Sequence, residues 1–186
     1  MKTLEFKNVP ADIQEKIIKQ EINDMYEFGS QYDPDVMLEG FALKLNLIGF
    51  NTTQSDISYS GFCSQGDGLS FVGELDIGVF CTKILAEHTK EQVFDDNVIA
   101  MLEKYKNDIG VFKVVRKYAN YVHEKSVEFD FEDFNDAEFM SFLEGFRYEL
   151  CILMYTEFKD YHDEFLIPAD VQTRLEEINM YWTLES

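Results

Sequence analysis

The stretch VEFDFE, from Val127 to Glu132, alternates strictly between apolar and acidic side chains. Successive side chains of a β-strand point to opposite faces, so this strand would bury one valine and two phenylalanines and present three carboxylates on the other side. Such alternation is typical of an antiparallel sheet with one face against the core and one in water, whereas strands of parallel sheets are buried on both faces. The sequence therefore predicts a sheet whose open face is acidic.

Three more strands and a tight turn are expected around this one. From Asp56 onward apolar and polar residues alternate, the SQGDG stretch interrupts them, and a matching strand covers residues 69–75. Gly66 and Gly68 can adopt positive φ, as a tight turn with a bulge requires, so this region is predicted to be a hairpin. A β-branched run, VFKVVRKYA, is the expected partner of the alternating strand in a second hairpin.

Five amphipathic helices are predicted from apolar residues at helical spacing. Pro10 and Pro168 stand where two of them begin, Gly49 is a C-terminal cap, and Asn135 or Asp136 is a candidate N-cap. The apolar stripes run over residues 13–26, 36–48, 93–105, 139–154 and 171–182. The order ααββαββαα indicates an α+β fold, with an antiparallel four-stranded sheet of two hairpins packed against several helices.

The chain carries a large acidic excess. Its 186 residues include 36 Asp and Glu against 16 Lys and Arg, a formal net charge of -20. Because 46% of the residues are hydrophobic and 17 are phenylalanine, we expect these acids on the surface of a single folded domain over residues 1–186. Such a surface repels nucleic acid phosphates and anionic membranes and attracts basic proteins. Direct binding to nucleic acid or to a membrane is therefore not expected.

The patterns of cysteines, metal ligands and hydropathy argue against a disulfide-rich, metal-binding, secreted or membrane protein. Cys63, Cys81 and Cys151 are odd in number and far apart, which favours buried reduced thiols over disulfides or a zinc site. No metal-binding motif occurs, and we expect neither a metal nor a cofactor. The first residues do not resemble a secretion signal, and no apolar run is long enough for a membrane helix. A soluble, cytoplasmic protein is expected.

The strongest functional candidate is an acidic block that starts on the alternating strand and continues into the long helix. Its carboxylates could reproduce the spacing of phosphate charges in DNA and so occupy a cleft that binds nucleic acid. A surface that only keeps the protein soluble is the alternative. The predicted contact residues are Glu128, Asp130, Glu132, Asp133, Asp136 and Glu138.

A second candidate lies in the SQGDG hairpin. Glycine-rich turns expose backbone amides that can bind phosphate, although the lysine of a P-loop and the GxGxxG pattern are both missing here. A small-ligand site or active site in this region would use Gln65, Asp67, Ser70 and His123. The formation of a tight turn explains the same glycines without a ligand. We therefore do not expect the protein to be an enzyme.

The hairpin segment YSGFCSQGDGLSF resembles the YFSGFWSQGDGASF-type signature of an uncharacterised family common in phage and prophage genomes, with Cys63 in place of the usual tryptophan. The segments DMYEFGSQYDP, LIGF, YVHEKSVEF and LCILMYTEFKDYHDEF are similar to other parts of that family, although Val127 replaces a methionine. Some members carry antitoxin-like labels. The resemblance implies a phage-encoded accessory protein that acts in the cytoplasm of a host bacterium, and it brings no known reaction.

Three hypotheses follow from these patterns. The first is a phage-encoded inhibitor that uses DNA mimicry to block a basic host protein, such as a nuclease, a CRISPR effector or a restriction component; analogy with other small acidic phage proteins supports it. The second is an antitoxin-like module that neutralises a toxin. The third is a ligand-binding protein or enzyme that uses the SQGDG hairpin and His123. A homodimer is compatible with each of them.

Overall fold

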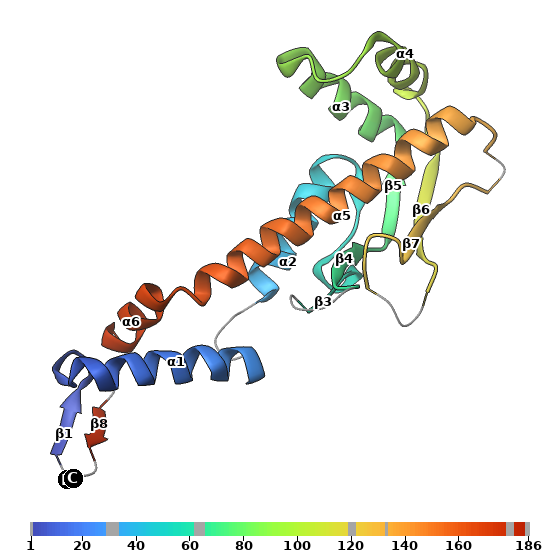
Figure 1. The fold of residues 1–186 in the computed structure, drawn as a ribbon. Coiled ribbons are helices and arrows are strands. Elements are labelled where there is room, and N and C mark those ends of the chain that lie inside the picture. The colour runs from blue at the N-terminus through green and yellow to red at the C-terminus, as the bar shows by residue number, and fades with distance from the viewer. Residues whose placement is uncertain are drawn as a thin grey trace. The chain divides into compact units, whose positions relative to one another are not determined.

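The computed structural model describes residues 2–28, 34–61, 66–118, 122–132, 134–177 and 181–184 (Figure 1). The chain forms two compact units, one of Met1–Asp33 with Phe158–Ser186 and one of Pro34–Glu157. Helices and antiparallel strands occur together, and one sheet has four antiparallel strands. The predicted α+β fold class is therefore confirmed.

The unit formed by the two ends of the chain joins a strand pair to a small apolar core. Its elements are β1 (Lys2–Glu5), the 3-10 turn η1 (Phe6–Asn8), α1 (Ala11–Phe28), α6 (Pro168–Glu177) and β8 (Tyr181–Leu184). Strands β1 and β8 pair antiparallel, and α6 packs against α1. Phe6, Met25, Val171 and Leu175 form the buried cluster of this unit, as expected where amphipathic helices turn their apolar stripes inward.

The last helix is shorter than its apolar spacing predicts. The spacing predicts a helix that reaches Trp182, whereas α6 ends at Glu177 and Tyr181–Leu184 form β8. Trp182 is the register partner of Leu4, at the opposite end of the chain. A strand partner this distant in sequence overrides the local helical pattern. Ile178, which belongs to the same stripe, lies outside the described residues.

The Pro34–Glu157 unit contains the four-stranded antiparallel sheet, in the order β2-β5-β6-β7. Its strands are β2 (Phe50–Asn51), β5 (Gly73–Asp76), β6 (Val111–Arg116) and β7 (Val127–Asp130). The predicted hairpin around SQGDG is present, but its strands form a separate two-stranded sheet: β3 (Ile57–Ser60) and β4 (Gly68–Phe71). The single strand predicted over residues 69–75 is therefore two strands in different sheets.

Val72 and Gly73 divide that predicted strand. The Val72 N–H donates to the Asp56 carbonyl (3.1 Å), and the Val72 carbonyl accepts from the Thr52 hydroxyl (2.8 Å). Gly73 has a φ of +152°, and a Cβ at this position would lie 2.6 Å from the Asn51 carbonyl oxygen. Only glycine can occupy such a site without moving the backbone. Contacts with the segment before β3 thus determine where the chain passes from one sheet to the other.

The described part of the same unit also contains four helical segments and a short turn. They are α2 (Pro34–Leu47), α3 (Ile77–Glu91), α4 (Asp96–Tyr105) and the first part of α5 (Ala137–Phe165), with a 3-10 turn η2 (Gln54–Asp56). Gly49, with a φ of +98°, follows α2 as predicted for a C-terminal cap. Helix α3 was not predicted. It follows β5 without a linker, and the last residue of that strand, Asp76, is its N-cap and accepts the Val79 N–H (2.8 Å).

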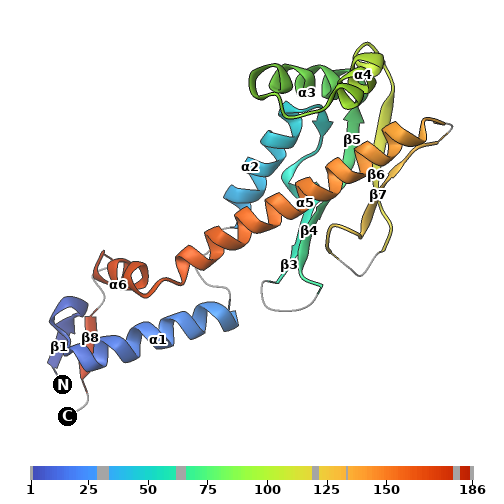
Figure 2. The same cartoon turned by 45° about the horizontal axis from the view of Figure 1, so that its top comes forward.

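Aromatic side chains fill the space between the sheet and α5, which crosses one face of the sheet (Figure 2). Phe80 is fully buried, and its ring centroid lies 5.0 Å from that of Phe146 on α5 and 6.5 Å from that of Phe50 on β2. Phe50 in turn stacks on Phe129 of β7, with centroids 6.3 Å apart. Burial of such large apolar surfaces is the main force that holds the unit together. The long helix thus covers one face of the sheet, as predicted.

Two of the three cysteines are buried free thiols in this unit. Desolvation raises the pKa of Cys81 and of Cys151 to about 12, so both thiols stay protonated at neutral pH. This agrees with the predicted reduced state of these two residues. Cys63 lies outside the described residues.

A buried arginine joins α5 to the neighbouring loop and strand. Arg147 is 5% exposed, and it donates from Nε to Glu144 (2.8 Å) and from Nη1 to the Glu124 carbonyl (2.7 Å). The other carboxylate oxygen of Glu144 accepts the backbone N–H of Phe129 on the edge strand β7 (2.7 Å). A buried charge needs such partners because an unpaired one is costly in the interior. Arg147 and Glu144 therefore hold α5, β7 and the loop before β7 together.

Asp136 anchors the start of α5 to α4. Its carboxylate accepts the Phe139 N–H (3.1 Å), as predicted for an N-cap, and also accepts from Lys104 Nζ and the Tyr105 hydroxyl (both 2.7 Å). These donors, the Lys104 ammonium first, hold the pKa of Asp136 well below its usual range. The negative charge of Asp136 therefore stabilises the folded state at neutral pH.

Replacing Arg147 by alanine should lower the free energy of unfolding by about 3 kcal/mol, because Glu144 and the Glu124 carbonyl lose their donor while staying partly buried. Urea denaturation followed by circular dichroism measures the change. Arg116→Ala is the matched control, since Arg116 is exposed and its loss should cost less than about 1 kcal/mol. Equal losses in the two variants would show that the buried junction contributes no more than a surface contact.

Asp136→Asn should remove the contribution of the Asp136 charge to the free energy of unfolding, and this contribution depends on pH. A carboxyl whose folded-state pKa lies below its ordinary value of 3.8 stabilises the protein above that pH, and this contribution is lost as the pH falls through the folded-state pKa. Asparagine is also a good N-cap, so the comparison isolates the charge. We expect the difference in unfolding free energy between wild type and variant to be constant from about pH 7 to about pH 5 and to shrink below about pH 4.

Asp96→Asn is the control for this experiment, because it removes one carboxylate at an exposed position on α4. A difference for Asp136→Asn that is independent of pH, or that matches the control, would contradict the anchoring role of the charge.

Candidate protein-binding surface

One face of the four-stranded sheet is exposed and carries charged side chains. Residues directly opposite each other on neighbouring antiparallel strands point to the same face. The register aligns one exposed row across the sheet: Asn51, Glu74, Lys113 and Asp130. The adjacent row is buried: Phe50, Leu75 and Phe112. One face of the sheet thus belongs to the core, and the other, here named the open face, contacts water.

Three of the predicted contact residues lie on the open face or directly after it. Glu128 and Asp130 are the outward-facing residues of β7, opposite Val115 and Lys113 of β6. Asp130 and Glu132 are exposed. Glu128 forms an ion pair with Lys117 (2.7 Å), and this contact raises the pKa of the lysine. The acidic residues of β7 therefore point to the solvent-exposed face, as the alternation of apolar and acidic residues predicts.

The helix part of the block lies at the start of α5. The carboxylate of Asp136 is bound to Lys104, Tyr105 and the helix N-terminus, so it serves the fold. Glu138 is exposed in the first turn of α5. Asp133 lies outside the described residues. The six predicted residues are thus not one row, because the strand residues share the open face whereas the helix residues cap or follow the start of α5.

Two acidic residues from other segments, Glu74 on the open face and Asp108 before β6, were not among the predicted contact residues. Glu74 stands in the exposed row beside Lys113. Asp108 is an exposed residue before β6, and its Oδ1 accepts the Gly110 N–H (2.6 Å). The alternation of Glu74 with buried Leu75 is a local signal that could have identified its outward direction. The pairing of β5 with β6, which places it near Asp130, is not visible in any single segment.

A hollow of about 380 Å³ opens beside the ends of β6 and β7. Its lining combines apolar and charged residues from three stretches of the chain: Ile77, Val111, Phe112, Phe134, Asp108, Lys113, Asp130 and Glu132. Ile77 and Phe112 are buried, while the charged residues are exposed. The apolar lining residues Ile77, Val111, Phe112 and Phe134 are here named the floor, and the charged ones, here named the rim, include more carboxylates than ammonium groups.

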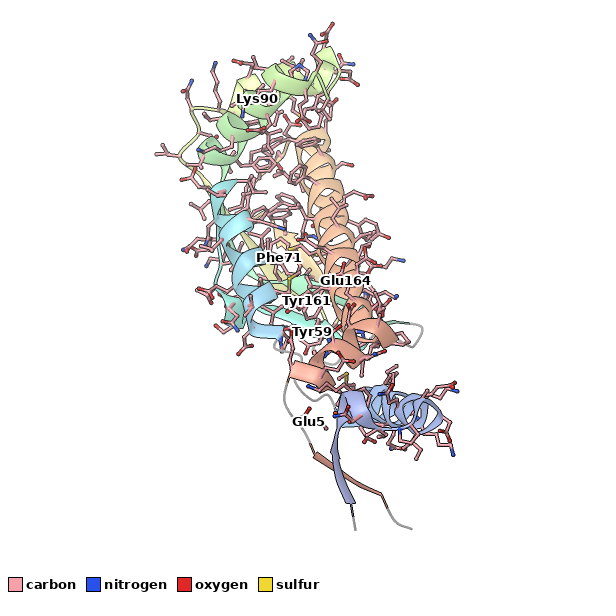
Figure 3. All side chains as sticks on the ribbon, turned by 90° about the vertical axis from the view of Figure 1, so that its left-hand side faces the viewer. Glu5, Tyr59, Phe71, Lys90, Tyr161 and Glu164 are labelled. Atoms are coloured by element: carbon pink, nitrogen blue, oxygen red, sulfur yellow. The ribbon has the colours of Figure 1, made fainter. Side chains whose placement is uncertain are left out.

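The signature hairpin, Tyr59–Phe71, has strands that are packed into the same unit. Phe71, which is labelled in Figure 3, and Ser70 are both buried, with exposed fractions of 1% and 0%. The Ser126 hydroxyl lies 3.4 Å from the Ser70 hydroxyl and donates to the His123 carbonyl (2.7 Å). A Cβ on Gly68 would lie 2.8 Å from the His123 Cα, so glycine is needed for the hairpin and this loop to approach each other.

Two of the four residues predicted for a ligand site are brought together. Ser70 and His123 meet through Ser126, and the His123 ring Nδ1 accepts the Lys125 N–H (3.0 Å). Asp67 lies beside Gly61, where a Cβ would be 2.8 Å from its carboxylate. Gln65 lies outside the described residues. The buried Ser70 hydroxyl and the internally bonded His123 favour a structural role for the described part of the hairpin.

The described residues contain no group of three or more His, Cys, Asp or Glu side chains that could hold a metal ion. In the same part of the chain, every helix is too short or too polar to cross a lipid bilayer.

Comparison with known proteins identifies a family. No curated protein and no solved structure matches the chain. A family model, described as a domain of unknown function (DUF8835), matches residues 30–178. This range is about four-fifths of the chain and includes the whole Pro34–Glu157 unit, with both the open face and the signature hairpin. The chain therefore belongs to the DUF8835 family.

Proposed function

We propose that this protein is an acidic inhibitor that binds and blocks a basic, nucleic-acid-handling protein through its open face. The proposed target is a host defence protein of the CRISPR or restriction type, a context that rests on the resemblance to phage proteins. The observation that carries the proposal is a group of carboxylates on one side of an antiparallel sheet: Glu74, Glu128 and Asp130 point outward from the open face, and the exposed Glu132 follows directly after β7. Such a group complements the Lys- and Arg-rich clefts that bind phosphates.

In the described part of the chain, the basic residues form few ion pairs with the carboxylates of the open face. At least nine of the 16 Lys and Arg side chains form an ion pair with a carboxylate of the same chain. One of these pairs, Lys117–Glu128, involves the open face. Among the described residues, Asp130 and Glu132 form no ion pair with Lys or Arg. A basic partner would therefore meet carboxylates whose charge is not already neutralised by contact.

The geometry of the sheet spaces these carboxylates regularly. Alternate residues of a strand lie about 6.7 Å apart, so the Cα atoms of Glu128 and Asp130 are separated by roughly two base-pair steps of about 3.4 Å each. Neighbouring strands are about 4.8 Å apart, which puts Glu74, two strands from Asp130, at roughly 10 Å from it. A cleft that binds successive phosphates can contact several of these side chains together. The spacing supports DNA mimicry as the mode of inhibition.

Affinity capture from a bacterial lysate, with and without excess duplex DNA, tests the proposal. Wild-type protein should capture a basic nucleic-acid-binding protein that DNA displaces. The variant Glu74→Lys/Asp130→Lys/Glu132→Lys should capture about tenfold less, because three attractive contacts become repulsive. The control Glu39→Lys/Glu91→Lys/Glu149→Lys changes the net charge equally at exposed helix positions and should retain capture.

Thermal unfolding of each variant verifies that it is folded before capture is compared. Capture that survives the reversals on the open face, or that falls equally in the control, would refute this surface as the binding site. A single small partner protein that DNA does not displace would favour the antitoxin-like hypothesis instead.

A further inference from the structure

The hollow beside the ends of β6 and β7 is lined by apolar and aromatic residues as well as by charged ones. A surface that binds through charge alone would not require these apolar residues. We propose that the hollow receives an arginine side chain of the partner protein, an inference that rests on the proposed function. Its volume of about 380 Å³ is at the lower end of the range for ligand pockets and is large enough for one long side chain. The apolar floor, the carboxylates and one partly exposed aromatic ring carry the inference.

Apolar side chains in and beside the hollow range from buried, as for Phe112, to almost fully exposed. Phe112 and the half-buried Phe134 meet edge to face, with ring centroids 4.9 Å apart. Val111 is 52% exposed, and the neighbouring Ile109 is 96% exposed. Apolar groups exposed at a concave site are typical of surfaces that become covered on binding. The aliphatic stem of a long basic side chain can pack on this floor while its charged end stays at the rim.

Carboxylates at the rim determine the sign of the group that would bind. Asp108, Asp130 and Glu132 line the hollow together with a single basic residue, Lys113. The hydrogen bond from the Gly110 N–H holds Asp108 in place. Asp130 and Glu132 have no Lys or Arg ion-pair partner in the described part of the chain. The charge of the rim therefore complements a cation.

Arginine fits the combination of rim and floor better than lysine. Its planar guanidinium can form two parallel hydrogen bonds with one carboxylate, stacks on aromatic rings and is more weakly hydrated than an ammonium group. In the hollow, Asp130 and Glu132 supply carboxylates and Phe134 supplies an aromatic ring. Lysine would gain the charge attraction without the paired hydrogen bonds and the stacking. Selectivity for arginine over lysine is thus the signature of this site.

Two short glycine-containing peptides of equal charge, one with arginines and one with lysines at the same positions, are the probes. Each is titrated into the isotope-labelled full-length protein at physiological ionic strength and followed by the NMR shifts of the backbone amides. We expect the largest shifts at Val111, Phe112 and Asp130, and about threefold tighter binding of the arginine peptide. Equal affinities for the two peptides, or shifts spread evenly over all acidic surfaces, would overturn the inference.

A variant tests the rim directly. Asp130→Asn/Glu132→Gln should lower the affinity for the arginine peptide by about threefold to tenfold. The variant should then bind the arginine and lysine peptides equally well. Glu39→Gln/Glu91→Gln removes two carboxylates at exposed helix positions and should change the affinity by less than about twofold. Equal weakening in both variants would show that the peptide responds to net charge and not to the hollow.

The two experiments separate failure of this inference from failure of the proposed function. If capture and its displacement by DNA hold while the peptides bind equally, the inhibitor function stands and the arginine site is wrong. If capture fails while the arginine peptide binds the hollow selectively, the arginine site stands and its partner is not a nucleic-acid-handling protein.

Discussion

The packing of α5 against one face of the four-stranded sheet is the constraint on which the other features depend. Aromatic residues of that face and its surroundings, such as Phe50, Phe80 and Phe129, bury the apolar surface that drives folding. Because side chains alternate along a strand, each residue next to a buried aromatic points to the opposite face. There a carboxylate such as that of Asp130 keeps its hydration and costs the fold little. Packing on one side thus allows core phenylalanines and acidic residues to share one short strand.

The net charge of -20 opposes compaction, and opposite charges are paired where α5 meets other elements. Lys104 binds Asp136 at the start of the helix, and Arg147 binds Glu144 further along it. Exposed ion pairs contribute little one by one, so these two matter through partial burial and through their additional hydrogen bonds to Tyr105 and to backbone groups. Lys104 and Arg147 thereby stabilise the contacts of α5 with its neighbouring elements. They do not neutralise the carboxylates of the open face.

Local signals predicted the type of most elements, and contacts between distant segments account for several of the differences. The alternation over residues 127–132 identified β7 and its outward carboxylates, and Pro168 marked the start of α6. The break at Val72 depends on bonds to the segment before β3, and the pairing of Trp182 with β1 turns a predicted helix into a strand. Likewise, Asp108 reaches the hollow only because β6 pairs with β7 beside it. Periodicity within one segment contains no information on such pairings.

The most distinctive motif of the sequence and the most accessible chemistry of the structure lie in different places. Gly68 is needed because the hairpin touches the His123 backbone, and Ser70 is buried beside Ser126. Contacts this close constrain residue choice through folding alone, so the motif requires no ligand to explain it. Asp130 and Glu132 belong to no motif, yet both are exposed to water at the end of β7, beside the apolar floor of the hollow. A partner can recognise only what the fold exposes, which is why the open face, and not the signature hairpin, is the better candidate for binding.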